Sequence, residues 1–114
     1  DFDAVEDCGL TNVCAMYQNA TDQNYNVGTG KRTSLKELAE LIVEIIGCKM
    51  PIQYAPRSQA TLVRNRIGCP KKASAEIGFT ATIDLREGLK RLVDWRATHI
   101  AEVEARRKAV GLPL

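Results

Sequence analysis

The sequence predicts an α/β fold, a small and partial one in which short strands alternate with about four helices. The first observation is the unit Asn24–Gly47, where a β-prone run enters a glycine turn and then an amphipathic helix. The second is that extended segments and helix signals alternate along the rest of the chain. The third is a composition of 45% hydrophobic and 26% charged residues, which is ordinary for a globular protein. The 114 residues therefore form one domain, or a part of one.

The helix of this central unit has its own start and stop signals. Ser34 and Glu37 have the spacing of a capping box, in which each side chain accepts a hydrogen bond from the other residue's backbone N–H. Apolar residues then follow at helical spacing and make one face: Leu35, Leu38, Ala39, Ile42, Ile45 and Ile46. Gly47 is placed to end the helix, because glycine adopts a left-handed conformation without a Cβ clash. The apolar face needs a sheet or another helix to cover it.

The segment before the central unit predicts a weak strand and then a helix. Phe2 and Val5 are the apolar residues of the strand. Asp7 is the expected N-cap of a helix from about Cys8 to Asn19. Apolar residues recur in that helix at intervals of three and four, although Gly9 weakens the pattern.

Two extended segments and a short helix follow the central unit. Pro51–Tyr54 predicts a strand that begins at a proline, and Leu62–Ile67 predicts a short extended segment. The short helix covers Lys71–Ile77, with Pro70 at its first turn and Gly78 at its end.

The last part of the chain predicts an extended segment and a long helix. Phe79–Thr82 is extended. Asp84 and Glu87 repeat the capping-box spacing, with aspartate at the first position. We expect one helix over Leu85–Ala109, whose apolar stripe thins toward its end.

Composition argues against several classes of function. A net charge of +2 and few aromatic residues do not indicate a nucleic-acid-binding protein. No apolar run approaches the roughly 20 residues that span a bilayer, so no membrane partner is expected. The four cysteines form no C-x-x-C pair and His99 lies far from them, so no metal site is expected. The sequence shows no leader, and the cysteines are expected to be free thiols, so we predict a cytoplasmic protein.

The glycine turn Gly28-Thr29-Gly30 invites comparison with nucleotide-binding loops, and it fails two tests. The dinucleotide fingerprint needs a third glycine where Thr33 stands, and a P-loop needs its first glycine where Tyr25 stands. We therefore expect a turn that needs glycine backbone angles. The alternative is that the backbone N–H groups of the turn face a ligand.

An acid-free stretch between Glu44 and Glu76 is the best candidate for ligand binding. It contains six basic residues: Lys49, Arg57, Arg64, Arg66, Lys71 and Lys72. Positive segments attract phosphates, and a guanidinium binds one through two hydrogen bonds. The alternative is a solvated surface whose carboxylate partners come from elsewhere in the fold. No catalytic set is visible, since His99 is expected on a solvated helix face and the tyrosines lack a lysine four residues downstream.

Four segments together carry a family resemblance: DFDAVEDC, YNVGTGKRTSLKELAE, YAPR with the following VRNRIGCPKKASAEIGF, and IDLREGLKRLVDW. They are similar, in this order, to segments that close the extended short-chain dehydrogenase/reductases. The chain thus resembles the C-terminal part of the NAD-dependent sugar epimerase/dehydratase family, typified by UDP-glucose 4-epimerase. The match covers nearly the whole chain.

The resemblance implies a substrate-binding lobe, with residues 1–114 as a single incomplete domain. Enzymes of this family bind NAD on an N-terminal Rossmann domain and use a Tyr-x-x-x-Lys pair with a Ser or Thr. This sequence contains neither, so the resemblance implies no catalytic, cofactor-binding or metal-binding residue here. It assigns Arg57, in the family's P-R-x-G-D segment, to the diphosphate of a nucleotide-sugar substrate. Gln59-Ala60 replace the Gly-Asp of that segment.

Two functions from different classes follow from these observations. The first is the nucleotide-sugar-binding portion of an NAD-dependent epimerase or dehydratase, which is not catalytic alone and whose partner is the missing Rossmann half. The alternative is an independent, non-enzymatic binding or assembly module that reuses this lobe. Exposed apolar faces would then drive homo-oligomer formation. Nucleic-acid binding through the basic stretch is a third and weaker candidate.

Overall fold

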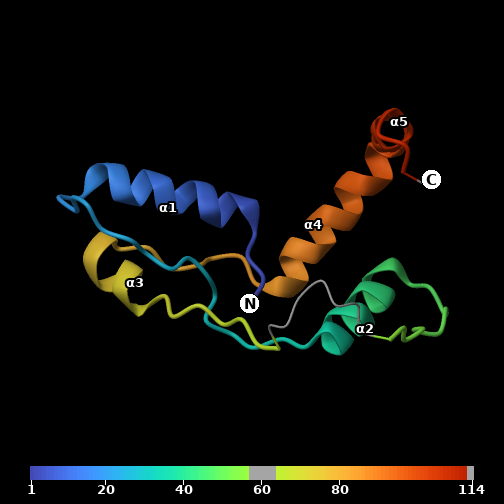
Figure 1. Ribbon diagram of the computed structural model, residues 1–114, viewed down its shortest axis with the longest axis horizontal. Coiled ribbons are helices and arrows are strands. Elements are labelled where there is room, and N and C mark those ends of the chain that lie inside the picture. The colour runs from blue at the N-terminus through green and yellow to red at the C-terminus, as the bar shows by residue number, and fades with distance from the viewer. Residues whose placement is uncertain (57–63, 113–114) are drawn as a thin grey trace.

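The computed structural model describes residues 1–56 and 64–112, and the regular structure within them is helical (Figure 1). The helices, in chain order, are α1 (Val5–Tyr17), α2 (Leu35–Ile46), α3 (Lys71–Ile77), α4 (Leu85–Thr98) and α5 (Ile100–Ala109). α1 packs against α3 at one end of the molecule, and α2 packs against α4 toward the other end. The chain measures 47 × 31 × 28 Å along its principal axes.

The predicted α/β fold is wrong for this structure, because no strand occurs among the described residues. The backbone groups of the connecting segments bind side chains instead of a neighbouring strand. The N–H groups of Thr29 and Gly30 donate to the carboxylate of Asp1, and the N–H of Thr82 donates to that of Asp7. A donor that is already bound to a carboxylate cannot enter a ladder, so these segments connect helices without forming a sheet.

Each predicted strand is affected by this correction. Within the described residues, strands are absent from 2–5, 24–27, 51–54 and 64–67, and 79–82 is irregular as well. The β-prone residues there give the segments their local preference, but β-structure also requires a paired edge.

The predictions for α2 are confirmed. The Ser34 hydroxyl accepts the Glu37 N–H at 3.1 Å, and the Glu37 carboxylate accepts the Ser34 N–H at 2.6 Å. Gly47 ends the helix with φ 73°. Its apolar face finds α4 as a partner, and Arg86 of α4 donates to both carboxylate oxygens of Glu44 at 2.9 Å.

The prediction for the start of α1 is wrong. The helix begins at Val5, with Ala4 at the N-cap and no side-chain cap, so the first segment is helical where a strand was expected. Asp7 therefore lies inside the first turn instead of capping it, and its side chain is buried. A carboxylate in the first turn still interacts favourably with the positive end of the helix dipole.

The C-terminal predictions are confirmed in part. α3 has the predicted bounds, and Asp84 caps α4 by accepting the Glu87 N–H at 2.8 Å. The single long helix is wrong, because it breaks at His99 into α4 and α5. The Thr98 hydroxyl donates to the Trp95 carbonyl, and a His99 ring nitrogen lies 2.9 Å from the same oxygen. Side chains that compete for helix carbonyls in this way favour a break.

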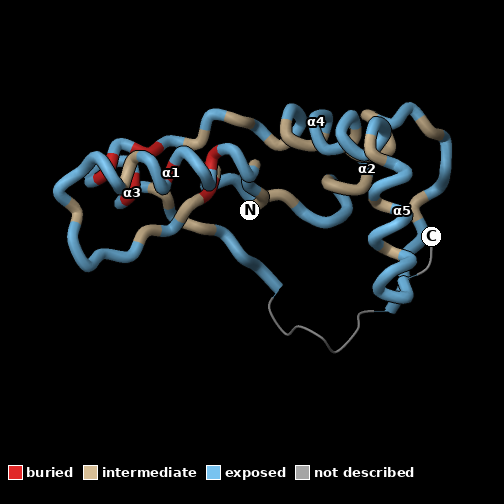
Figure 2. Tube along the Cα trace, turned by 90° about the horizontal axis from the view of Figure 1, so that it is seen from above, coloured by how far each residue is buried: buried red, intermediate tan, exposed pale blue. Residues whose placement is uncertain are grey.

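The buried core is small and lies at the end of the molecule formed by α1 and α3 (Figure 2). Its buried apolar residues are Ala73, Ile77 and Phe79, and half-buried residues of α1 and of the segment before α2 pack around them. Neither α2 nor α4 contains a buried residue. The apolar residues that face each other between these two helices are therefore at most half-buried.

Candidate functional site

Two carboxylates hold the glycine turn. Asp1 accepts the Thr29 hydroxyl at 2.6 Å and the N–H groups of Thr29 and Gly30 at 3.3 and 2.9 Å. Asp3 accepts the same Thr29 N–H at 3.1 Å. Gly30 has φ 72°, and a Cβ on Gly28 would lie 2.7 Å from an Asp1 carboxylate oxygen. The turn therefore requires glycine at both positions, once for its backbone angle and once for space.

These contacts decide between the two interpretations of the turn. The N–H groups of Thr29 and Gly30 already have carboxylate acceptors, so they are not available to a phosphate. An anionic ligand there would also meet the negative charges of Asp1 and Asp3. The prediction of a structural turn is confirmed.

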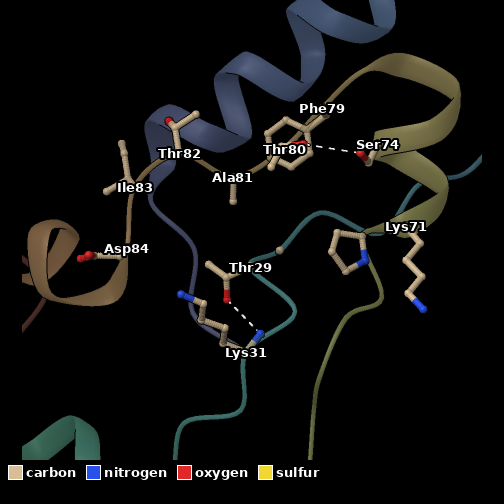
Figure 3. A pocket seen from close by; sticks show the side chains of 12 residues that line it. Thr29, Lys31, Lys71, Ser74, Phe79, Thr80, Ala81, Thr82, Ile83 and Asp84 are labelled. Carbon is tan, nitrogen blue, oxygen red and sulfur yellow. Dashed lines mark hydrogen bonds between the residues drawn. The ribbon is translucent and has the colours of Figure 1, made fainter.

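An open hollow of about 410 Å³ lies between the glycine turn, the start of α3 and the segment 79–84 (Figure 3). Hydroxyl groups line part of it, and those of Ser74 and Thr80 lie 3.5 Å apart. Lys31 and Lys71 also belong to the lining, and the Lys71 side chain points away from the other side chains in Figure 3. Among the described residues of the lining there is no guanidinium, the group that binds a diphosphate through paired hydrogen bonds.

Asp7 fixes one wall of this hollow. Its side chain is buried, and it accepts the Thr82 hydroxyl at 2.9 Å, the Thr82 N–H at 3.1 Å and the Ile83 N–H at 3.0 Å. Burial alone raises the pKa of Asp7, but these donors and the positive charge of Arg91 outweigh it and hold the pKa below its ordinary value. The ionised carboxylate thus binds the segment before α4 to α1.

Arg57, the predicted substrate contact, lies outside the described residues. The described residues that follow the gap carry two exposed guanidinium groups, Arg64 and Arg66. This segment is joined to the glycine turn region twice. The backbone nitrogen of Asp1 donates to the Arg66 carbonyl at 2.8 Å, and Arg32 donates to the Asn65 side chain at 3.2 Å.

Lys72 of the basic stretch has a structural position. Its ammonium donates to the Gln23 side chain at 2.8 Å and to the Asn24 carbonyl at 3.2 Å, and it lies 5.0 Å from the centre of the Tyr25 ring. The Tyr25 hydroxyl donates to Glu76 at 2.8 Å. Burial and this hydrogen bond to Glu76 raise the pKa of Tyr25. The contacts given for Lys72 do come from elsewhere in the fold, but they are an amide oxygen, a carbonyl and an aromatic ring where carboxylates were expected.

His99, expected on a solvated helix face, is half-buried at the junction of α4 and α5. Its ring stacks on Trp95 with the centroids 4.7 Å apart. In the part of the chain that the structure describes, no three His, Cys, Asp or Glu residues gather in a metal-binding arrangement. The four cysteines are free thiols.

The role of Asp1 and Asp3 was not predicted from the sequence. A usable signal was present, because alternate residues of an extended segment project to the same side. That spacing indicates two carboxylates on one face, but it does not indicate which backbone donors they meet. The partner, a turn 26 or more residues away, is visible only in the structure.

Proteins with a similar sequence have names that describe enzymes of nucleotide-sugar metabolism. No model of a known protein family matches the chain. A putative UDP-glucose 4-epimerase of Methanocaldococcus jannaschii is 35% identical over 95 residues, which is 83% of this chain and 30% of the relative. A putative GDP-L-fucose synthase 2 of Arabidopsis thaliana is 29% identical over 102 residues, which is 90% of this chain and 30% of the relative. The chain thus spans less than a third of the length of these relatives.

Solved structures agree with the sequence relatives. The Bordetella bronchiseptica enzyme WbmF, in complex with NAD+ and UDP, matches 98% of this chain with a TM-score of 0.81 at 30% identity. The match takes up 34% of the WbmF chain. WbmG of the same organism matches 87% of this chain with a TM-score of 0.72, and at 22% identity it shows a shared fold alone. Among the described residues, no helix is both long and apolar enough to cross a membrane.

Proposed function

We propose, on the premise that this chain is homologous to the C-terminal part of the extended short-chain dehydrogenase/reductases, that it binds the nucleotide-sugar substrate of such an enzyme. The reaction class would be that of the NAD-dependent sugar epimerases and dehydratases. The chain alone would not catalyse it, because its sequence contains no dinucleotide fingerprint and no Tyr-x-x-x-Lys pair.

One observation carries the proposal. The structure resembles, over 98% of its length, part of an enzyme whose crystals contain both NAD+ and UDP. Both ligands contain a diphosphate, and we assign UDP to this chain because its sequence contains no dinucleotide fingerprint for NAD+. Its acid-free stretch supplies exposed guanidinium groups, which bind a diphosphate well, whereas the donors of its glycine turn are already occupied.

Arg57 is the residue we assign to the substrate diphosphate. It stands in Pro56-Arg57, the part of the chain that resembles the family's P-R segment. Arg64 and Arg66 follow in the same basic stretch and add to the local positive charge that attracts a phosphate. The sugar and the base of the nucleotide are not assigned to residues.

The cofactor and the partner follow from the same proposal. NAD would be bound by a separate Rossmann domain of the intact enzyme, and that domain would be the partner of this chain. The site of action would be the cytoplasm, which agrees with the four free thiols.

Calorimetric titration of the 114-residue chain tests the proposal. We expect UDP to bind, uridine to bind more weakly because it lacks the phosphates, and NAD+ to give no binding heat. Arg57→Ala should weaken UDP binding by about tenfold or more, because it removes charge-assisted hydrogen bonds. Arg96→Ala, an exposed arginine of α4 with the same change of charge, is the matched control and should leave UDP affinity unchanged.

Two results would overturn the proposal. One is a wild-type chain that does not bind UDP at millimolar concentration. The other is tight NAD+ binding by the 114 residues, because the cofactor would then belong to this part of the enzyme.

A further inference from the structure

α1 buries polar side chains in its first two turns and exposes several large apolar ones. The helix buries polar side chains, with Asp7 2% and Thr11 7% exposed. Its large apolar side chains face solvent instead: Val5 is 78%, Met16 81% and Tyr17 83% exposed. A helix on the surface of a closed domain normally has the opposite arrangement. The outward face of α1 therefore has the composition of an interior surface.

Gly9 lies in the middle of this outward face. Val5, Gly9, Val13 and Met16 are spaced at four, four and three residues, which places them on one side of the helix. A Cβ on Gly9 would meet nothing within 4 Å, so no contact in this chain requires glycine there. Glycine weakens a helix interior, but it lets another backbone approach the helix closely. We call Val5, Gly9, Val13 and Met16 the outer face of α1.

The accessible surface of the chain is larger than that of a compact protein of the same mass. Its accessible area is 9284 Å², whereas a folded monomer of 12.6 kDa exposes about 6,200 Å². The excess of about 3,000 Å² is several times the roughly 800 Å² that each partner buries in a standard protein–protein interface. A surface this large is typical of a piece of a larger folded body rather than of a protein that meets a transient partner.

We infer that the outer face of α1 docks onto the NAD-binding domain of the same enzyme. This inference rests on the proposed function and names the surface by which that partner is held. The matched region is 34% of WbmF, so about two-thirds of that NAD-binding enzyme lies outside it, which is enough to cover the excess area. A second copy of the chain would cover too little of the excess at a standard interface.

A lipid surface is a poorer occupant of the outer face. Helices that lie on membranes carry lysine and arginine on their polar side. α1 has Glu6 and Asp7 in its first turn and no basic residue anywhere in its sequence. Its charge would be repelled by anionic lipid headgroups.

The test compares the same substitutions in two settings. Val13→Lys with Met16→Lys is the test pair, and Leu92→Lys with Val110→Lys is the control pair. The control side chains are similarly exposed, at 59% and 70% against 47% and 81%, but they lie on α4 and after α5. One setting is the 114-residue chain. The other is a full-length enzyme in which residues 1–114 of this protein replace the corresponding part of the Methanocaldococcus relative.

In the 114-residue chain both pairs should leave the circular dichroism spectrum and the UDP affinity unchanged, because all four side chains face solvent. In the full-length enzyme the test pair should lower the midpoint of thermal unfolding by roughly 5 °C or more, because two charges would enter an apolar contact. It should also reduce the NAD retained through gel filtration. The control pair should change neither measurement.

Three outcomes would overturn the inference. The first is an equal effect of the test and control pairs in the full-length enzyme. The second is a 114-residue dimer that the test pair converts to monomer while the full-length enzyme is unaffected, which would assign the face to a second copy. The third is binding of the 114-residue chain to phosphatidylcholine–phosphatidylserine vesicles that the test pair abolishes. Failure of UDP binding by the wild-type chain would instead count against the proposed function, so the two failures are distinguishable.

Discussion

Asp7 shows how one side chain can hold segments that are distant in the sequence. Its carboxylate binds the backbone of Thr82 and Ile83, 75 and 76 residues further along the chain. The site is buried, so each of these donors would lose its partner without regaining water if the carboxylate were removed. Arg91, which lies 3.6 Å from Glu6, adds a positive charge near the same helix end.

We predict that Asp7 makes the stability of the chain depend on acid pH. Its pKa is lower in the folded state than the ordinary value of 3.8, so the unfolded chain binds a proton more readily. The stabilisation is therefore complete above about pH 5 and is lost as the pH falls below about 4. Asp7→Asn should lower the free energy of unfolding at pH 7 by about 1–3 kcal/mol and flatten its decline in acid. Urea titrations at several pH values measure both.

Asp94→Asn is the control for this prediction, because Asp94 is an exposed carboxylate of α4. Its substitution should change neither the stability at pH 7 nor the acid dependence. An Asp7→Asn protein with wild-type stability and a wild-type acid profile would show that the buried contacts contribute nothing.

Local signals were sufficient for some residues and not for Asp7. The hydrogen bonds of Ser34 and Glu37 close within three residues, so their spacing in the sequence contains the whole arrangement. An aspartate near a helix start is equally consistent with a cap and with a buried tertiary contact. Only the position of Thr82 in space distinguishes the two, and no local pattern encodes it.

At the scale of elements, α2 is the helix whose start depends most on its own sequence. It contains no buried residue, so the capping box and the contact with α4 provide much of what holds it in place. The hydrogen bond from the Ser34 N–H lowers the pKa of Glu37 most, and the interaction with the Ser34 hydroxyl lowers it further, so this pKa lies below its ordinary value. The cap therefore works best when Glu37 is ionised.

We predict that Ser34→Ala destabilises the chain by about 1 kcal/mol, because the Glu37 N–H loses its acceptor. Ser34→Asp should retain most of the stability, since aspartate is also a good N-cap. Chemical denaturation with a helix-sensitive signal compares them. Equal loss in the Asp and Ala variants would mean that the capping interaction is not the cause.

The connecting segments show where reasoning by element was insufficient. Residues 24–27 and 51–54 have the composition of strands, but a strand exists only when another strand pairs with it. In this chain the neighbouring N–H groups of the glycine turn are taken by Asp1 and Asp3. The helix signals were reliable because a helix satisfies its own backbone, whereas the strand signals depended on a partner.

At the scale of the whole molecule, the shape is more extended than that of a closed domain. The radius of gyration is 17.3 Å, whereas a compact domain of 114 residues has about 13 Å. Among residues 1–56 and 64–112, the buried core contains three apolar side chains, and many large apolar side chains remain exposed. The large radius of gyration and the large accessible surface have the same cause, which is that apolar side chains are not packed against other parts of the chain.

We predict that small-angle scattering of the dilute 114-residue chain gives a radius of gyration near 17 Å rather than 13 Å. The exposed apolar side chains should also bind the dye ANS without added denaturant. Light scattering on the same sample supplies the mass, so that association is not mistaken for extension. A monomer near 13 Å with no dye binding would mean that the chain closes on itself, as an independent module does.

The sequence predicted that the candidate site binds a phosphate group through basic residues, but it did not predict where in the fold these residues lie. The charge pattern singled out the basic stretch, and Arg57 within it stays a prediction because it lies outside the described residues. Lys72 belongs to the same pattern, yet it packs over Tyr25, because charge in a sequence does not specify which partner is near. The family resemblance, which rests on several segments in order, agreed with the relatives found by sequence and by structure.

The bonds from Asp1, Asp3 and Asp7 have a consequence for how the chain acquires its shape during translation. When the ribosome has released α1, the atoms that Asp7 needs have not yet been made, since they lie at positions 82 and 83. The contacts of Asp1 and Asp3 with the glycine turn can form early, but the carboxylate of Asp7 stays hydrated until the chain has been extended from the end of α1 at Tyr17 to Ile83. The buried hydrogen bonds of Asp7 to Thr82 and Ile83 can therefore form only after Ile83 has been synthesised.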